Sequence, residues 1–210
     1  MLIRRCAARP MLSLLILGSA MAMGAAGQEV LLEACDVASI VDPVETTDLR
    51  LLMRFEIPEE LSSAIIELAV VEFEAGVQAD AAGGGLALSA FPLTSNWSPA
   101  SADWASGWEN AGGDFDRGTH AASVARPSDA ALIRLDVTDF VGLWAASPES
   151  NVGLIVTKPD GEAGQFSPAC TEGSRTGQPV LRIWYTRCDR VENEDGRQAS
   201  TRPPQRRPRR

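Results

Sequence analysis

The chain has 210 residues, a formal net charge of −9, 45% hydrophobic residues and a single histidine. One histidine, His120, argues against most zinc sites, which need several His or Cys ligands. From residue 28 to residue 188 there are nine Lys or Arg against 24 Asp or Glu, a net charge of −15. A body this acidic repels polyanions, so we expect no nucleic acid or acidic polysaccharide as its partner unless calcium intervenes.

The first 27 residues have the pattern of a signal peptide. Three arginines precede the apolar run MLSLLILGSAMAM, which is too short to span a bilayer. The small residues of GAAGQEV predict cleavage after Ala26 or Gly27. We therefore expect a secreted protein, extracellular or periplasmic, with no membrane insertion after signal cleavage.

The first expected strands, EVLLEA and DVASIV, flank Cys35, which bears on disulfide pairing. Cys6 leaves with the signal, so Cys35, Cys170 and Cys188 remain in an oxidising compartment. Strands from the two ends of a sandwich often lie side by side, which favours a disulfide between Cys35 and Cys188. Cys170 is the alternative partner.

Short apolar segments recur between Gly, Pro, Ser and Asp, which is typical of an all-β sandwich. We expect residues 28–188 to form one domain of two antiparallel sheets. The expected strands cover residues 29–34, 36–41, 49–57, 64–73, 86–91, 132–137, 152–157 and 180–186.

One of these strands has an ambiguous pattern. In PEELSSAIIELAVVEFEA, Leu61, Ile65, Leu68 and Val71 lie at helical spacing. The same stretch also fits strand alternation at Ile66, Leu68 and Val70 and then at Val71 and Phe73, with one register break between Val70 and Val71. The β-branched content and the preceding Pro58 favour a strand.

The segment NWSPASADWASGWENAGGDF places Trp97, Trp104 and Trp108 within twelve residues of small and polar side chains. Three interpretations stay open at this point. The indoles could form a stacking surface for a ligand, a hydrophobic plug over a core, or the centre of a self-folded surface loop.

The segment DVTDFVGLW predicts one short helix near residues 138–146, with Thr138 placed to cap it and Pro148 to stop it. Such a short helix must dock on the sandwich, with Trp144 as its anchor. We expect both Trp144 and Trp184, in the last strand, to belong to the core.

Residues 189–210, DRVENEDGRQASTRPPQRRPRR, have no apolar periodicity and carry six Arg and no acid after Gly196. This composition predicts a disordered tail. We favour a solvated tail over attachment to an anionic envelope component or to the acidic body itself.

Taken in order, several segments resemble the DNRLRE domain family, related to the jelly-roll carbohydrate-binding modules of secreted bacterial and archaeal proteins. The resemblance runs from about residue 29 to residue 186. The segments that carry it are DVASI, LLMRFEIPEELSSAIIELAV, NWSPASADW, LDVTDFVGLW, NVGLIV, FSPACTEG and QPVLRIWYT.

The resemblance implies a jelly roll in which residues 64–73 form a strand. It also implies that Trp97 and Trp104 are structural, which leaves Trp108 as the best exposed platform. The chain departs from the family in its short connection DPVETTD and in loops without tyrosine.

The predicted function is that of a non-catalytic carbohydrate-binding module that takes a neutral polysaccharide or cell-surface glycan weakly, with micromolar to millimolar affinity. The sugar would stack on Trp108, together with Trp97, and polar side chains would accept its hydroxyl hydrogen bonds. Those side chains are Asp103, Glu109, Asn110 and Asp114.

A structural calcium ion is a further expectation, at Asp36 and Asp136, although hydrogen bonding explains these acids equally well. No enzyme is expected, because no constellation of residues meets the requirements of a catalytic site. The alternative function is a structural or adhesive envelope or matrix protein whose basic tail attaches to anionic surface polymers.

Overall fold

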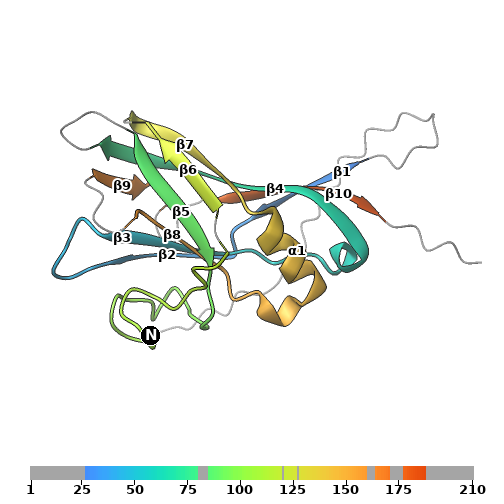
Figure 1. The fold of residues 1–210 in the computed structure, drawn as a ribbon, viewed down its shortest axis with the longest axis horizontal. Helices are drawn as coiled ribbons and strands as arrows, with labels where there is room; N and C mark the ends of the chain where they lie inside the picture. Colours follow the sequence, from blue (N-terminus) through green and yellow to red (C-terminus); the bar gives the residue numbers. More distant parts are fainter. Residues whose placement is uncertain are drawn as a thin grey trace, which may run out of the picture.

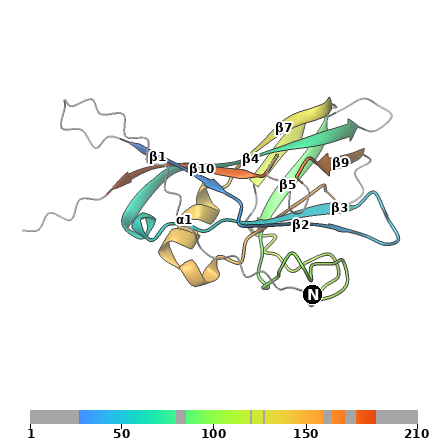
Figure 2. The same ribbon diagram turned by 180° about the vertical axis from the view of Figure 1, so that it is seen from behind.

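The computed structural model describes residues 27–79, 85–119, 121–126, 128–159, 164–170 and 177–187. Two antiparallel sheets pack together as a sandwich with one short α-helix at its side, as Figures 1 and 2 show from opposite directions. The predicted all-β sandwich is therefore confirmed. Within these ranges no helix is both long and apolar enough to cross a bilayer.

The first sheet, sheet A, contains both the first and the last described strand. Its order is β1 (Gln28–Glu33), β10 (Val180–Arg187), β4 (Ala64–Ala79) and β7 (Ser128–Asp136), and β9 (Gly164–Pro168) pairs with the far half of β4. The expectation that strands from the two ends are neighbours is confirmed by the pairing of β1 with β10.

The second sheet, sheet B, has the order β2 (Asp36–Val41), β3 (Leu49–Arg54), β8 (Leu154–Thr157), β5 (Leu86–Pro92) and β6 (Ala121–Ala125). The sequence did not predict β6 or β9. Both are short, and their sequences AASVA and GQFSP lack the run of large apolar residues that marks the other strands.

The main core lies between the sheets and follows strand alternation. Strand β5 alternates buried and partly exposed positions along its whole length. Strands β3 and β8 differ, because consecutive residues are buried in both. Leu51 and Met53 face the main core, whereas Leu52 belongs to a second hydrophobic cluster. Sheet B is therefore covered on both faces.

Helix α1 (Thr138–Ala146) has the predicted position, and Trp144 is its buried anchor at 1% exposure. The predicted capping role of Thr138 is wrong, since Val137 occupies the N-cap position without a side-chain cap. The Thr138 hydroxyl instead donates to Asp136 at 2.6 Å and accepts from the backbone N–H of Ala69 at 2.9 Å. Thr138 thus ties the helix to β4.

Two short 3-10 turns, η1 (Glu59–Ser63) and η2 (Pro148–Ser150), flank this region. Together with the described strands, they account for the regular structure around the helix.

Residues 64–73 are strand, as predicted, but the register break lies at Glu67, as a β-bulge, and not between Val70 and Val71. Trp184 pairs with Leu68 and Tyr185 with Ile66, which leaves Glu67 as the extra residue. Tyr185 points inward in the same alternation as Leu181 and Ile183, and it is 6% exposed. Trp184 lies on the opposite, outer face and is only partly buried, so its predicted core position is wrong.

The predicted disulfide is not found. Cys35 and Cys170 both carry free thiols, which also removes the alternative pairing between them. Cys188 lies outside the described residues. The physical reason is the antiparallel register: Glu33 pairs with Val180, so Cys35 follows β1 near the start of β10, whereas Arg187 ends β10.

Burial raises the pKa of the Cys35 thiol, and the negative charge of Asp36 raises it further. Its Sγ donates to the carbonyl of Arg54 at 3.2 Å. Cys35 is therefore a protonated thiol at neutral pH rather than a reactive thiolate.

Candidate functional site

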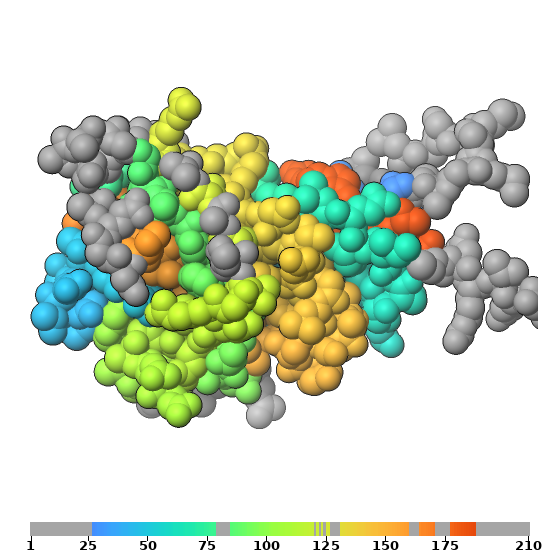
Figure 3. All heavy atoms as spheres, viewed as in Figure 1, coloured from blue at the N-terminus to red at the C-terminus, as the bar shows by residue number. Residues whose placement is uncertain are grey.

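The segment with three tryptophans, residues 94–119, lies over the outer face of sheet B; we call it the tryptophan loop. Figure 3 shows it in yellow-green as a lobe next to the helix. Its indoles pack with apolar side chains from β2, β3, β8 and β5 in the second hydrophobic cluster. The buried members of this cluster are Ile40, Leu52, Leu93, Trp97 and Ile155. Of the three interpretations open at the sequence level, the hydrophobic plug over a core describes most of the loop.

Arg50 in β3 joins the loop to the sheet. Its guanidinium lies 4.4 Å from the ring centre of Trp104 and donates from Nη1 to the carbonyl of Gly112 at 2.8 Å. Asp48 balances its charge at 3.3 Å. Arg50 is 8% exposed, and its Nε has no hydrogen-bond acceptor in the described part of the chain. The unsatisfied Nε–H lowers the stability of the closed loop, and the contacts of the guanidinium with the Trp104 ring and the Gly112 carbonyl oppose that cost.

Sequence reasoning missed Arg50. The only sequence signal is that Arg50 directly precedes the apolar run LLM. The outer face of this strand is apolar as well, but its burial becomes apparent only when the loop is seen to cover it. Gly112 was missed as well. It has a φ of +88°, and a Cβ there would lie 2.6 Å from Nη1 of Arg50. Only glycine fits this close approach.

Trp97 is buried at 7% exposure, and its Nε1 donates to the carbonyl of Val152 at 2.8 Å. Arg54 lies 5.4 Å from its ring centre and forms an ion pair with Asp36. The ring of Trp97 is therefore buried against other side chains of the protein and is not exposed to a ligand. Its expected structural role agrees with this position.

Two of the predicted sugar-binding carboxylates instead hold the loop together. Asp114, 8% exposed, accepts hydrogen bonds from the Ser95 hydroxyl, from the backbone N–H of Glu109 at 2.8 Å, and from both the backbone and side-chain N–H of Asn110 at 2.9 and 3.0 Å. Burial raises the pKa of Asp114, but these hydrogen bonds outweigh it and hold the pKa below its usual value. Asp114 has little capacity left for a ligand.

Asp103 organises a turn in the same loop. Its carboxylate accepts from the Ser106 hydroxyl and from the backbone N–H groups of Ser106 and Ala105, at 2.6 and 2.7 Å. The Ser106 hydroxyl, followed by these backbone bonds, lowers the pKa of Asp103. Its exposed carboxylate is thus already engaged in the turn.

Trp108 is partly exposed at the outer end of the loop. Its Nε1 donates to the carbonyl of Asp103 at 2.8 Å, so the polar edge of the ring is satisfied inside the loop. Its ring packs at the border of the second cluster. The neighbouring side chains of Glu109 and Asn110 are exposed. The structure thus brings together one fixed indole and two polar side chains.

The two predicted calcium ligands are not brought together. Asp36 lies in β2 of sheet B and is paired with Arg54, whereas Asp136 ends β7 of sheet A and accepts from Thr138. No group of three or more His, Cys, Asp or Glu with metal-site geometry occurs in the described ranges. The predicted use of these acids in hydrogen bonding agrees with their positions. His120 lies outside the described residues.

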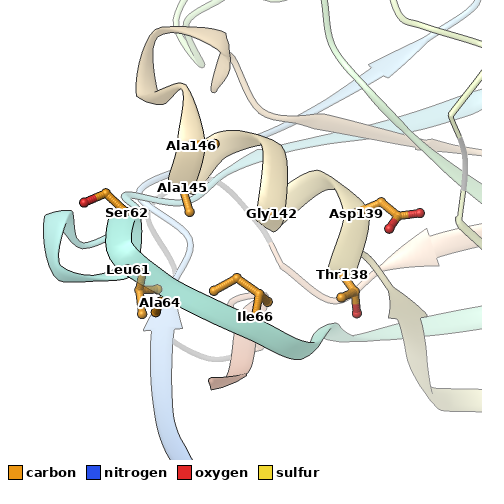
Figure 4. Close-up of a pocket in the computed structure, with 9 residues that line it drawn as sticks. All are labelled: Leu61, Ser62, Ala64, Ile66, Thr138, Asp139, Gly142, Ala145 and Ala146. Carbon is orange, nitrogen blue, oxygen red and sulfur yellow. The ribbon is translucent and has the colours of Figure 1, made fainter. Parts of the chain in front are cut away.

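A cavity of about 270 Å³ lies between the start of β4 and α1. Its walls are mostly apolar or small, and Figure 4 shows the carboxylate of Asp139 directed away from Leu61 and Ile66. The hydroxyl of Thr138 is already bonded to Asp136 and the backbone of Ala69. With the Thr138 hydroxyl already bonded and the Asp139 carboxylate directed away, the cavity offers little to orient a ligand.

No known family model matches the chain, and no curated protein sequence matches it either.

Proposed function

We propose that the protein is a non-catalytic binding module that takes a neutral glycan at the outer end of the tryptophan loop. The observation that supports this most is the state of Trp108. Its N–H is bonded within the loop and its backbone neighbours are fixed by Asp103 and Asp114, so the ring needs no reordering to receive a ligand. A pre-organised aromatic ring binds with less entropic cost than a mobile one.

Polar contacts would come from the two exposed neighbours. The carboxylate of Glu109 and the amide oxygen of Asn110 are the acceptors for sugar hydroxyls, because the amide nitrogen of Asn110 already donates to Asp114. This set is smaller than the sequence predicted, since Trp97, Asp103 and Asp114 are used by the fold. One ring and two acceptors favour weak binding to one or two sugar units.

The test is a glycan array followed by titration calorimetry on residues 28–210. W108A should lose at least tenfold in affinity for any glycan found, and W108F should retain part of it, because the smaller ring still stacks. E109Q should weaken binding, while the matched variant E149Q, on the exposed turn η2, should not. Equal binding by W108A and the parent chain, or no glycan bound by the parent, contradicts the proposal.

A second candidate, a structural or adhesive envelope protein, draws on one feature of the structure. The outer face of sheet A carries exposed apolar side chains, among them Leu31 and Ile65 at 54% and 58% exposure. Large apolar side chains exposed on one face are a feature of protein contact sites. Salt-sensitive cell association that is lost on deletion of residues 197–210 would favour this function, and salt-independent association would count against it.

A further inference from the structure

The outer face of sheet A differs from that of sheet B in having no described segment across it. Four large aliphatic side chains point outward there and are exposed by 36–58%. Trp184 lies among them on the central strand β10, opposite Leu68 of β4. The four aliphatic residues are Leu31, Ile65, Leu68 and Leu132. An indole and four aliphatic side chains on one exposed face form a surface suited to a partner.

This outer face is also acidic. Six carboxylates occupy outward positions of its strands, against the two guanidiniums of Arg134 and Arg182. The carboxylates belong to Glu29, Glu33, Glu67, Glu72, Glu74 and Asp136. A partner with a matching surface would therefore carry positive charge.

Both guanidiniums are already paired within the face. Arg182 contacts Glu29 at 2.5 Å and Glu72 at 3.6 Å, and Arg134 contacts Glu72 at 2.7 Å. The hydrogen bond from Arg134 lowers the pKa of Glu72, and that from Arg182 acts in the same direction. Glu33 and Glu74 are exposed and have no ion pair within the described part of the chain.

The chain itself contains a segment of the matching chemistry. Residues 197–210 hold six arginines and three prolines and no acid. Arginine pairs with carboxylates and stacks on indole faces, and proline favours an extended backbone that can lie along a sheet without joining it. The arginines of the segment can therefore pair with the carboxylates of the face and stack on the indole of Trp184.

The connection is long enough. Strand β10 ends at Arg187 between β1 and β4, at one end of the face. The nine residues 188–196 can span about 30 Å at 3.3–3.6 Å per residue. Glu33 pairs with Val180 at the other end of β10, roughly 23 Å from Arg187 at about 3.3 Å per residue, and Glu74 lies two residues further along β4 than the partner of Val180. The basic segment can therefore reach both carboxylates.

We propose that residues 197–210 dock on the outer face of sheet A of their own chain, with guanidiniums on Glu33 and Glu74 and against the ring of Trp184. Attachment to the same chain favours this over a free cationic partner, since the short connection gives a millimolar effective concentration. It is also favoured over a second copy of the face, because two acidic faces repel each other. An anionic polymer that binds the segment would uncover the face.

Carboxyl footprinting by carbodiimide labelling and mass spectrometry tests this on residues 28–210. If the face is covered about two thirds of the time, labelling of Glu33 and Glu74 should rise roughly threefold when the six arginines are replaced by glutamine. A similar rise is expected in the parent chain at 0.5–1 M NaCl, since about 1 M salt shortens the screening length to roughly 3 Å. Labelling of Glu109 and Glu149 should not change.

A second measurement follows the segment itself. In the parent chain, trypsin cleavage after Arg197 and Arg206 should be slow at low salt. The double variant E33Q/E74Q should release this protection, whereas the matched double variant E109Q/E149Q, which removes the same charge elsewhere, should not. The combined results separate loss of docking from a general change in net charge.

Three outcomes overturn the proposal. One is equal labelling of the face with and without the arginines. Another is protection that grows with protein concentration, which would assign the face to a second copy. The third is a rise in labelling at Glu192 and Glu194 instead, which would place the arginines on the acidic residues before them. Glycan binding is read separately through Trp108 over sheet B, so either proposal can fail alone.

Discussion

Replacing Gly112 with alanine tests whether the tryptophan loop is pinned through Arg50. The new Cβ would lie 2.6 Å from Nη1 and 2.9 Å from Cζ of Arg50, and 3.1 Å from Cη2 of Trp104. Relief requires the guanidinium to move, which breaks its 2.8 Å hydrogen bond to the Gly112 carbonyl. A hydrogen bond to a charged group contributes about 1.5–3 kcal/mol. A positive φ costs a non-glycine residue about 1–2 kcal/mol more.

We therefore expect G112A to lower the free energy of unfolding of the loop by about 2.5–5 kcal/mol. Urea titration with tryptophan fluorescence would measure it, with hydrogen exchange to show whether the loss is confined to residues 94–119. Gly107 provides the control, since its φ is +87° but a Cβ there meets nothing within 4 Å. G107A should carry only the backbone cost. If both variants lose the same stability to within about 0.5 kcal/mol, a common error for independent sites, the pinning contact is refuted.

Three further predictions concern the same side of the molecule and its helix. W97F removes the donor to the Val152 carbonyl and should cost about 1–2 kcal/mol in urea unfolding, whereas a cost near zero would mean that water replaces the bond. The pKa of Asp114 is depressed, so its carboxylate stabilises the fold above about pH 4, and this stabilisation is lost as the pH falls through the folded pKa. D114N should be less stable than the parent chain at pH 7 and should not show this loss of stability at acid pH. W144F removes a buried Nε1–H that has no acceptor in the described part of the chain. It should therefore lower the free energy of unfolding, measured by thermal unfolding, by less than the roughly 3–5 kcal/mol of a Trp-to-Ala truncation.

The sequence by itself determined the architecture. Alternating apolar segments between turn residues predicted eight strands, and all eight are present. The short apolar stripe before Pro148 predicted α1 at residues 138–146. These features are local, because the spacing of apolar residues and the positions of turn residues act within a few residues of the chain. Burial of Trp144 also followed from local pattern, because a helix this short is stable only when docked.

Other features depended on which strands become neighbours. The bulge at Glu67 shifts which β4 side chains face the core, and only the pairing of β4 with β10 reveals it. Because β1 runs antiparallel to β10, Cys35 lies near the start of the last strand, whereas Cys188 follows its last residue, Arg187. This register argues against the predicted disulfide. Register is a property of the paired strands, so a single strand's sequence does not fix it.

The composition of the candidate site likewise depends on the tertiary structure. The cluster of three tryptophans was visible in the sequence, and the family resemblance implied structural roles for Trp97 and Trp104 and an exposed Trp108. The contacts that bury Trp97 and place Trp104 against Arg50 are visible only in the fold. Asp103 and Asp114 have the composition of sugar ligands, yet the fold uses both to close the loop. A carboxylate binds whichever donors lie nearest, and only the folded chain determines which donors those are.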